Sequence, residues 1–264
     1  MSIELAYRIV DVFTDRPLAG NALCVVLDPC PDPVMQAVAR ETNLSETTFS
    51  VVTGEGTYEM RIFTPTEELP FAGHPSLGTA WVLGPGRWTQ TTSGATVVVE
   101  ADAAGAVMSQ PDPVFEAADP APLAEVLGLA GADGAVVATA AGVGHLVVAA
   151  DAPIEHLDPA PSRVAAATRA AGVTTLCVVR RRDDRTLHVR VFVPAGGIPE
   201  DPGTGAAAGP VATFARAQWG TDVDVTILQG AEIGRPCRIE VHAEPGALRV
   251  GGRVAPCAAG RFTL

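Results

Sequence analysis

The sequence lacks the features that place a chain in a membrane or on a nucleic acid. No apolar run reaches the roughly 18 residues that a membrane-spanning helix needs. The first residues, MSIELAYRIVDVF, have neither the charged start nor the apolar core of a secretory signal, so we expect a cytoplasmic protein. The net charge is −12, and the basic cluster Arg180–Arg182 is followed at once by Asp183 and Asp184. Because such a chain repels phosphate backbones, no nucleic-acid partner is expected.

Cysteine is scarce and scattered, which argues against a disulfide framework and against structural zinc. The five cysteines are Cys24, Cys30, Cys177, Cys237 and Cys257. They form no CxxC pair, and no histidine stands at the spacing of a metal ligand. We therefore expect each of them to be a small buried apolar side chain.

What the sequence does contain is enough apolar material for a large core. Of the 264 residues, 47% are hydrophobic and 18% are charged, which is typical of a compact protein of one large or two smaller domains. Short β-branched runs predict strands at Tyr7–Phe13, Ala22–Leu27, Thr48–Val52, Glu59–Phe63, Ala95–Glu100, Ala135–Thr139, His145–Ala149, Thr175–Val179, Leu187–Val193, Val225–Ile227, Arg238–His242 and Leu248–Val254. Helices are predicted at Pro33–Glu41, Ser76–Leu83, Leu123–Leu127, Arg163–Ala170 and Thr204–Ala217. The proline-rich stretch Pro111–Ala121 is the best candidate for a linker.

The two halves of the chain repeat the same order of segments. GNALCVVLD from Gly20 matches GHLVVAAD from Gly144, SETTFSV from Ser45 matches GVTTLCV from Gly172, and RIFTP from Arg61 matches RVFVP from Arg190. A glycine-containing loop then opens a helix of small residues in each half, AGHPSLGTAW and PGTGAAAGPV. Four matches in one order predict a duplicated domain of about 120 residues.

The repeated turn before the helix of small residues is the part best suited to bind a ligand. Gly73-His74-Pro75 and Gly203-Thr204-Gly205 each bring backbone N–H groups to a helix N-terminus with few side chains in the way. Such an end binds anions, and two of them in a cleft between the domains would hold a carboxylate. The alternative, that both are only tight turns, stays open for each turn taken alone.

Ionisable residues that only one half possesses are the best candidates for chemistry. In the sequence alignment of the halves, Glu46 matches Val173, His74 matches Thr204, and Asp201 matches Phe71. A partly buried carboxylate such as Glu46 can take up and return a proton near neutral pH. Each residue also has a structural alternative: a turn cap or an arginine partner for Glu46, a core histidine for His74, and an N-cap for Asp201. His145, His156, His188 and His242 receive no role.

The segments that carry these residues resemble one known family. NLSETTF, RIFTPTEELPFAGHPSLGTA, EDPGTGAAAGP and LQGAEIGRP are similar to the signatures of the PhzF-like isomerases of phenazine biosynthesis, and the resemblance runs nearly from end to end. It implies an α+β chain of the diaminopimelate-epimerase type. Two similar domains would each roll a β-sheet into a barrel around a central helix, with the site in the cleft between them. We expect domains at 1–115 and 116–254, with 255–264 returning to the first.

The resemblance also implies roles for individual residues. Glu46 would be the acid/base, while His74 and Asp201 would bind and polarise the substrate. A carboxylate substrate would contact the turns at Gly73, Pro75, Ser76, Gly203, Thr204, Gly205 and Ala206. The family is commonly a homodimer and uses neither a metal nor an organic cofactor.

Two departures limit the chemistry. Diaminopimelate epimerases use two cysteines at the turns, and Ala72 and Pro202 stand there in this sequence, so a two-cysteine mechanism is excluded. The phenazine enzyme carries a serine where this chain has Ala206, which puts the phenazine precursor in doubt as the substrate. We expect a proton shift along a small unsaturated acid by Glu46. The alternatives are an amino-acid or proline-derivative epimerase, and a binding protein without catalysis.

Overall fold

The computed structural model describes residues 3–194 and 198–264 and shows an α+β chain of two compact units. The first unit contains the chain up to Ser109 together with Gly251–Leu264, and the second contains Gln110–Val250. The C-terminal strand therefore returns to the first unit. Both boundaries lie a few residues before the expected ones at 115 and 254.

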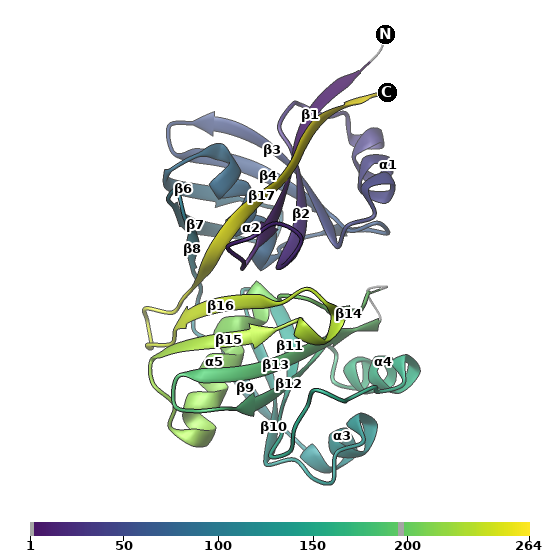
Figure 1. Ribbon diagram of the computed structural model, residues 1–264, viewed down its shortest axis with the longest axis vertical. Coiled ribbons are helices and arrows are strands. Elements are labelled where there is room, and N and C mark those ends of the chain that lie inside the picture. The colour runs from purple at the N-terminus through teal and green to yellow at the C-terminus, as the bar shows by residue number, and fades with distance from the viewer. Residues whose placement is uncertain (1–2, 195–197) are drawn as a thin grey trace. The chain divides into compact units, whose positions relative to one another are not determined.

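Eight strands of the first unit close into a barrel. They are β1 (Glu4–Val12), β2 (Asn21–Val26), β3 (Glu46–Gly54), β4 (Thr57–Phe63), β6 (Gly86–Thr91), β7 (Thr96–Ala101), β8 (Gly105–Ser109) and β17 (Arg249–Thr263). They pair in the order β1-β2-β3-β4-β6-β7-β8-β17, and β17 pairs with β1 again to complete the ring. Figure 1 shows β17, in yellow, running beside β1, in purple. The short strand β5 (Glu68–Leu69) extends the edge of β4.

Helix α2 (Gly73–Leu83) lies inside this barrel, against β1, β2, β3, β7 and β8. Its sequence, GHPSLGTAWVL, has no charged side chain, and a helix without a polar face must be enclosed. The strands approach closely because the helix carries small residues. A Cβ atom on Gly78 would lie 2.7 Å from Leu23 Cδ2 and 2.9 Å from Val12 Cγ2.

Helix α1 (Asp32–Thr42) covers the outside of the barrel, next to β3 and β4 (Figure 1). It buries one face only, through Met35, Val38 and Ala39, against Phe49 and Phe63.

Helices α1 and α2 also explain the strand directions. The pairs β2–β3 and β4–β6 are parallel, and parallel neighbours need a crossover connection, which α1 and α2 provide.

The second unit repeats this plan. Its strands are β9 (Val114–Ala118), β10 (Gly134–Ala140), β11 (Val143–Ala149), β12 (Thr175–Arg181), β13 (Thr186–Val193), β14 (Ile198–Asp201), β15 (Asp224–Gln229) and β16 (Cys237–His242). They pair in the order β9-β10-β11-β12-β13-β15-β16, with β14 on the end of β13. Helix α5 (Gly205–Trp219) packs against β10, β11, β12 and β16 and connects the parallel pair β13–β15.

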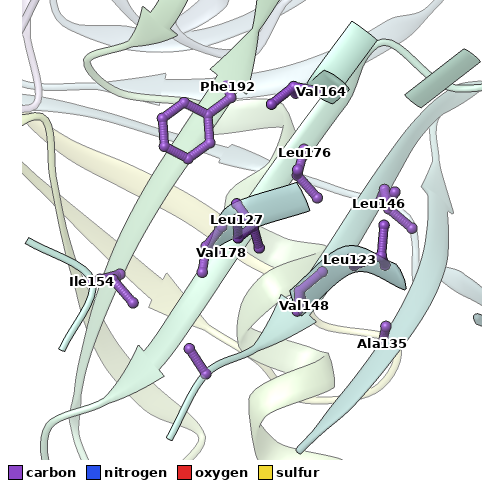
Figure 2. Close-up of a cluster of buried hydrophobic side chains, with 11 residues drawn as sticks. Leu123, Leu127, Ala135, Leu146, Val148, Ile154, Val164, Leu176, Val178 and Phe192 are labelled. Atoms are coloured by element: carbon purple, nitrogen blue, oxygen red, sulfur yellow. The ribbon is translucent and has the colours of Figure 1, made fainter. Parts of the chain in front are cut away.

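Helices α3 (Pro120–Leu127) and α4 (Pro161–Ala170) cover the other face of this sheet. Figure 2 shows the cluster between them, to which Leu123 and Leu127 contribute from α3 and Val164 from α4. Leu176 and Phe192 meet them from β12 and β13. This cluster corresponds to the one beneath α1 in the first unit, so each unit has a helix within its sheet and helical cover outside.

The duplication is also visible in a repeated side-chain group. In each unit an arginine binds a glutamate through Nε and Nη2, with N···O distances from 2.6 to 3.0 Å, and its guanidinium lies about 5 Å from a phenylalanine ring. The two groups are Arg61, Glu68 and Phe63, and Arg190, Glu200 and Phe192. The shared group shows which residues of the two units correspond.

Several sequence expectations are wrong. Pro111–Ala121 is no linker, because it forms β9 and the start of α3, and β9 pairs with β10. The sequence analysis did not predict five of the strands, which form by pairing with their neighbours: β5, β6, β8, β9 and β14. Of the five cysteines, Cys257 is exposed and Cys30 only partly covered.

Among the described residues, no group of histidine, cysteine and acidic side chains could hold a metal.

Closure of the barrel between β8 and β17 yields a prediction. A Cβ atom on Gly105 would lie 2.1 Å from Gly252 O and 2.8 Å from Arg253 Cα, so the backbone must move. We expect Gly105→Ala to lower the free energy of unfolding by about 1–3 kcal/mol, measured by urea denaturation. Gly131→Ala is the control, because nothing lies within 4 Å of its Cβ position. Equal stability of the two variants would contradict the close contact.

Candidate active site

Glu46 and His74 meet at the end of the barrel where α2 begins. Glu46 is the first residue of β3, and His74 is the second residue of α2. His74 Nε2 lies 3.3 Å from Glu46 Oε2, and the side chains are only 5% and 13% exposed. The structure thus brings together two of the three catalytic residues expected from sequence, and it removes both from bulk water.

Two residues that the sequence reasoning did not select hold this histidine. Asn21 Nδ2 lies 3.2 Å from His74 Nδ1, and Ser45 Oγ donates to Asn21 Oδ1 over 3.1 Å. Asn21 is the first residue of β2, and Ser45 comes directly before Glu46. Ser45 stands in NLSETTF, which resembles a family signature, and Asn21 stands in the repeated segment GNALCVVLD, so these two patterns were the available signals. Their hydrogen bonds fix the orientation of the imidazole ring.

His74 is a neutral imidazole in this environment. Burial lowers the pKa of His74 to about 3, and a hydrogen bond with the Ala22 backbone offsets that shift only in part. Near pH 7 the ring therefore carries one proton and no charge. The contact with Glu46 is then a polar contact between a carboxyl group and a neutral ring, rather than an ion pair.

The first turn of α2 surrounds this pair with backbone groups. The N-cap, Ala72, has no side chain that could bond to the free N–H groups, and the first turn contains no acidic residue. Gly73, Pro75 and Ser76 are buried there, and Ser76 Oγ donates to Ala72 O over 2.8 Å. The Ser76 hydroxyl is thus occupied within the helix. The positive end of the helix dipole lies beside Glu46 and His74.

Asp201 occupies the corresponding region of the second unit. It ends β14, and Thr204 Oγ1 donates to its Oδ2 over 2.5 Å. Thr204 is the N-cap of α5, so the helix begins at Gly205, and Gly203 lies in the turn ahead of it. Ala206 follows in the first helical turn. The structure thus gathers Asp201 with Gly203, Thr204, Gly205 and Ala206, and it gathers Glu46 with Gly73, His74, Pro75 and Ser76.

The register of the sheets corrects the alignment of the two halves by two residues. Arg61 pairs with Phe49, and its counterpart Arg190 pairs with Val178, so Phe49 corresponds to Val178. Glu46 lies three residues before Phe49, and Thr175 lies three residues before Val178. Glu46 therefore corresponds to Thr175. Val173, the match expected from sequence, is two positions away. The same reasoning applies to Asp201. It directly follows Glu200, and Leu69 directly follows the corresponding Glu68, so Asp201 corresponds to Leu69 and not to Phe71.

The helix starts shift by the same two residues. The N-caps are Ala72 and Thr204, so His74 corresponds to Ala206 and not to Thr204. Ala72 likewise corresponds to Thr204 and not to Pro202, and neither an alanine nor a threonine can replace the epimerase cysteine as a base. A two-residue shift keeps every strand residue on the same face, which is why the sequence pattern did not reveal it. Glu46, His74 and Asp201 still have no ionisable counterpart.

His145 is a buried polar residue of the second unit to which the sequence analysis gave no role. Its Nδ1 lies 2.6 Å from Oγ1 of Thr175, the counterpart of Glu46, and the ring also interacts with the Ala206 backbone. Pro210 has no N–H group, so the Ala206 carbonyl lacks its usual partner within α5. His145 therefore supports the first turn of α5 at the place where the helix lacks a donor.

Comparison with known proteins shows the family. The family model described as "Phenazine biosynthesis-like protein" matches residues 10–260. The chain belongs to the PhzC-PhzF family. The trans-2,3-dihydro-3-hydroxyanthranilate isomerase of Pseudomonas aeruginosa is 37% identical over 98% of this chain and 99% of the relative. An uncharacterized isomerase of Mesorhizobium japonicum is 34% identical over 98% of each chain. This PhzC-PhzF member is thus an isomerase.

Solved structures share the fold. A PhzF-family protein of Bacillus anthracis matches 99% of this chain and all of its own with a TM-score of 0.86 at 21% identity. A hydroxyproline epimerase of Agrobacterium vitis matches 99% of this chain and 93% of its own with a TM-score of 0.63 at 12% identity. Both likenesses concern the fold alone. Within residues 3–194 and 198–264, no helix of the PhzC-PhzF chain combines the length and apolar character needed to cross a bilayer.

Burial of His145 generates a prediction about pH. Burial lowers the pKa of His145 to about 4, from about 6.5 when unfolded, so below pH 6.5 the unfolded chain binds a proton that the folded chain does not. The contribution of this group to stability is complete above pH 6.5 and falls by about 3 kcal/mol as the pH drops to 4. We expect His145→Asn to remove that part of the pH dependence, measured by urea denaturation from pH 7.5 to 4.

The control for this experiment is His242→Asn, at a partly exposed histidine whose pKa is raised by Asp224. It should leave the steep loss of stability below pH 6.5 in place. A His145→Asn profile parallel to that of the unaltered protein would show that His145 takes up its proton equally well in the folded state.

Proposed function

We propose that this protein is an isomerase that shifts a double bond in a small unsaturated carboxylic acid by moving one proton with Glu46, without a cofactor. The observation that carries the proposal is the Glu46–His74 contact: an almost fully buried carboxyl group beside a neutral imidazole, 3.3 Å apart, at a helix N-terminus. A buried carboxyl group can act in turn as base and acid. Trans-2,3-dihydro-3-hydroxyanthranilate, named for the relative at 37% identity, represents the substrate class.

The reaction balances with a single group. The Glu46 carboxylate takes a proton from a C–H bond next to the unsaturated system, and the released electron pair moves into the conjugated chain. The new carboxylic acid then gives the same proton to a carbon further along the chain, on the same face. One C–H bond breaks and another forms, and no oxidant or reductant is required.

The other residues serve binding and charge. The backbone N–H groups in the first turns of α2 and α5 are suited to the substrate carboxylate. His74 supplies a neutral ring whose orientation Asn21 fixes, and it can hydrogen-bond to an amino, hydroxyl or oxo group of the substrate. Asp201, aligned by Thr204, orients a second polar group. The proposal includes the action of both clusters on one substrate, a homodimer and a cytoplasmic location.

Ala206 bears on the identity of the acid. It stands in the first turn of α5, where the resemblance expects a serine, and it brings no hydroxyl to a substrate. A substrate of the same shape with one polar group fewer at that point fits this chain better than the phenazine precursor does. The first compounds to assay are therefore the precursor itself and analogues that lack its amino or its hydroxyl group.

An epimerase remains the second candidate, because it needs only one further proton carrier. His74 or Asp201 would have to serve on the opposite face of the substrate. The third alternative was a binding protein without catalysis. Because the chain belongs to a family of isomerases, nothing supports that alternative.

Removal of the proton carrier tests the main proposal. We expect Glu46→Gln to lower kcat by about 10³-fold or more, because the amide keeps the shape of the side chain but cannot accept the proton. The Kd of anthranilate, used as a substrate analogue and measured by calorimetry, should change less than about threefold. Glu41→Gln, at an exposed carboxylate at the end of α1, is the matched control and should keep full activity. More than a tenth of the normal kcat in Glu46→Gln would refute the assignment.

Deuterium distinguishes the two candidate reactions. With ordinary substrate in D₂O, a single carboxyl group that returns its own proton should give a product with clearly less than one deuterium at the new C–H position. An epimerase with two proton carriers should instead introduce one full deuterium at the inverted carbon in each turnover. The measurement is mass spectrometry and proton NMR of the product at low conversion, before exchange can accumulate.

A further inference from the structure

Gln229 is a buried amide next to the Asp201 turn, and the proposed mechanism does not yet use it. It is the last residue of β15, it is 2% exposed, and it pairs with Val189 of β13 and Cys237 of β16. Its backbone is therefore held within the sheet on both sides. Its side chain leaves the sheet edge and reaches the turn between β14 and α5.

The side-chain amide of Gln229 spans this turn with three hydrogen bonds. Its Nε2 donates to Asp201 O over 2.8 Å and to Thr204 Oγ1 over 3.0 Å. Its Oε1 accepts the Thr204 backbone N–H over 3.2 Å. Both amide donors and the amide acceptor are thus used, and they tie the two ends of the turn, Asp201 and Thr204, to each other and to the sheet.

These bonds also decide the direction of the hydroxyl proton of Thr204. An amide N–H can only donate, so the Thr204 oxygen must accept from Gln229. Its own proton is then free to point to Asp201 Oδ2, 2.5 Å away. The chain of donors runs from Gln229 through Thr204 to the Asp201 carboxylate, and it orients that carboxylate as an acceptor.

The glycine that follows allows the sheet edge to approach. Gly230 has φ 78°, and a Cβ atom there would lie 2.4 Å from Pro202 O and 2.5 Å from Arg235 O. Backbone therefore packs on backbone between Gly230 and the turn, within the same unit. Gln229 and Gly230 together form a support for the turn, built from the LQG of the LQGAEIG segment.

We propose that Gln229 is the positioning residue of the Asp201 turn: its amide holds Thr204 so that the hydroxyl orients the Asp201 carboxylate for the substrate. This inference rests on the proposed function, in which Asp201 contacts the substrate. It adds a residue that acts only through others, since its three bonds go to the turn.

Replacement by glutamate probes this role with almost no change of shape. In Gln229→Glu the ionised carboxylate still accepts the Thr204 N–H, but it cannot donate to Asp201 O or to Thr204 Oγ1. Protonation of the new carboxyl restores one donor. Measurements are expressed relative to the unaltered protein at each pH, because the neighbouring elements carry other charged or titratable groups. These are Cys177, His188, Arg190, Glu200, Asp201, Glu232, Arg235, Cys237, Arg238, Glu240 and His242.

The first readout needs no substrate. We expect hydrogen–deuterium exchange of the amides at 203–206, corrected for the intrinsic rates, to be at least tenfold faster in Gln229→Glu than in the unaltered protein at pH 8. The difference should shrink toward pH 5. Gln218→Glu is the matched control: Gln218 donates to Asp133 O near the other end of α5, and the variant should leave exchange at 203–206 unchanged.

The second readout is kinetic, on an acid that the unaltered protein isomerises. We expect kcat/KM of Gln229→Glu to fall at least tenfold at pH 8 and to recover relative to the unaltered protein as the pH falls to 5, whereas a role limited to the stability of the turn predicts faster exchange with unchanged kcat/KM. Exchange at 203–206 within twofold of normal at pH 8, or faster exchange with unchanged kcat/KM, would overturn the inference. Loss of activity in Glu41→Gln or full activity in Glu46→Gln would instead count against the proposed function.

Discussion

The need to enclose a helix without a polar face governs the structure of the first unit. Helix α2 is apolar or small on every side, so it is stable only where strands surround it, and the barrel of the first unit closes around it between β8 and β17. Enclosure has a second consequence at the helix start. The N–H groups of the first turn and the polar side chains near them lie at the end of the barrel, out of bulk water, where each of them needs a partner.

The chemistry of the site follows from that burial. A histidine in the first turn of an enclosed helix loses its charge, because the protonated ring would be removed from water, and the pKa of His74 falls to about 3. The neutral ring then needs a donor or acceptor for each nitrogen, and Asn21 and Glu46 stand beside its two nitrogens. Burial thus leaves a neutral imidazole, held by Asn21 at Nδ1, with a carboxyl oxygen 3.3 Å from Nε2.

In the second unit, other residues provide the partners of the polar groups at the start of α5. Pro210 interrupts the hydrogen bonding of α5, and His145 supports the first turn from β11 in a neutral state, paired with Thr175, where the first unit has Glu46. Thr204, Asp201 and Gln229 complete the polar end of α5. One duplicated framework therefore carries two different polar ends, and in the proposed reaction one supplies the proton carrier and the other orients the substrate.

The sequence by itself determined the α+β class, the duplication, most of the longer strands and the five α-helices of the described residues, and it predicted Glu46, His74 and Asp201 as catalytic residues, because these depend on local patterns and on motifs. Only the tertiary structure decided the pairing of short strands such as β8 and β14, the place of Pro111–Ala121 in the sheet, and the true counterparts of the three residues. A strand pattern repeats every two residues, so an alignment error of two leaves it unchanged. The partners Asn21 and Gln229 come from positions 53 and 25 residues away from His74 and Thr204, and contacts over such separations exist only once the sheets have formed.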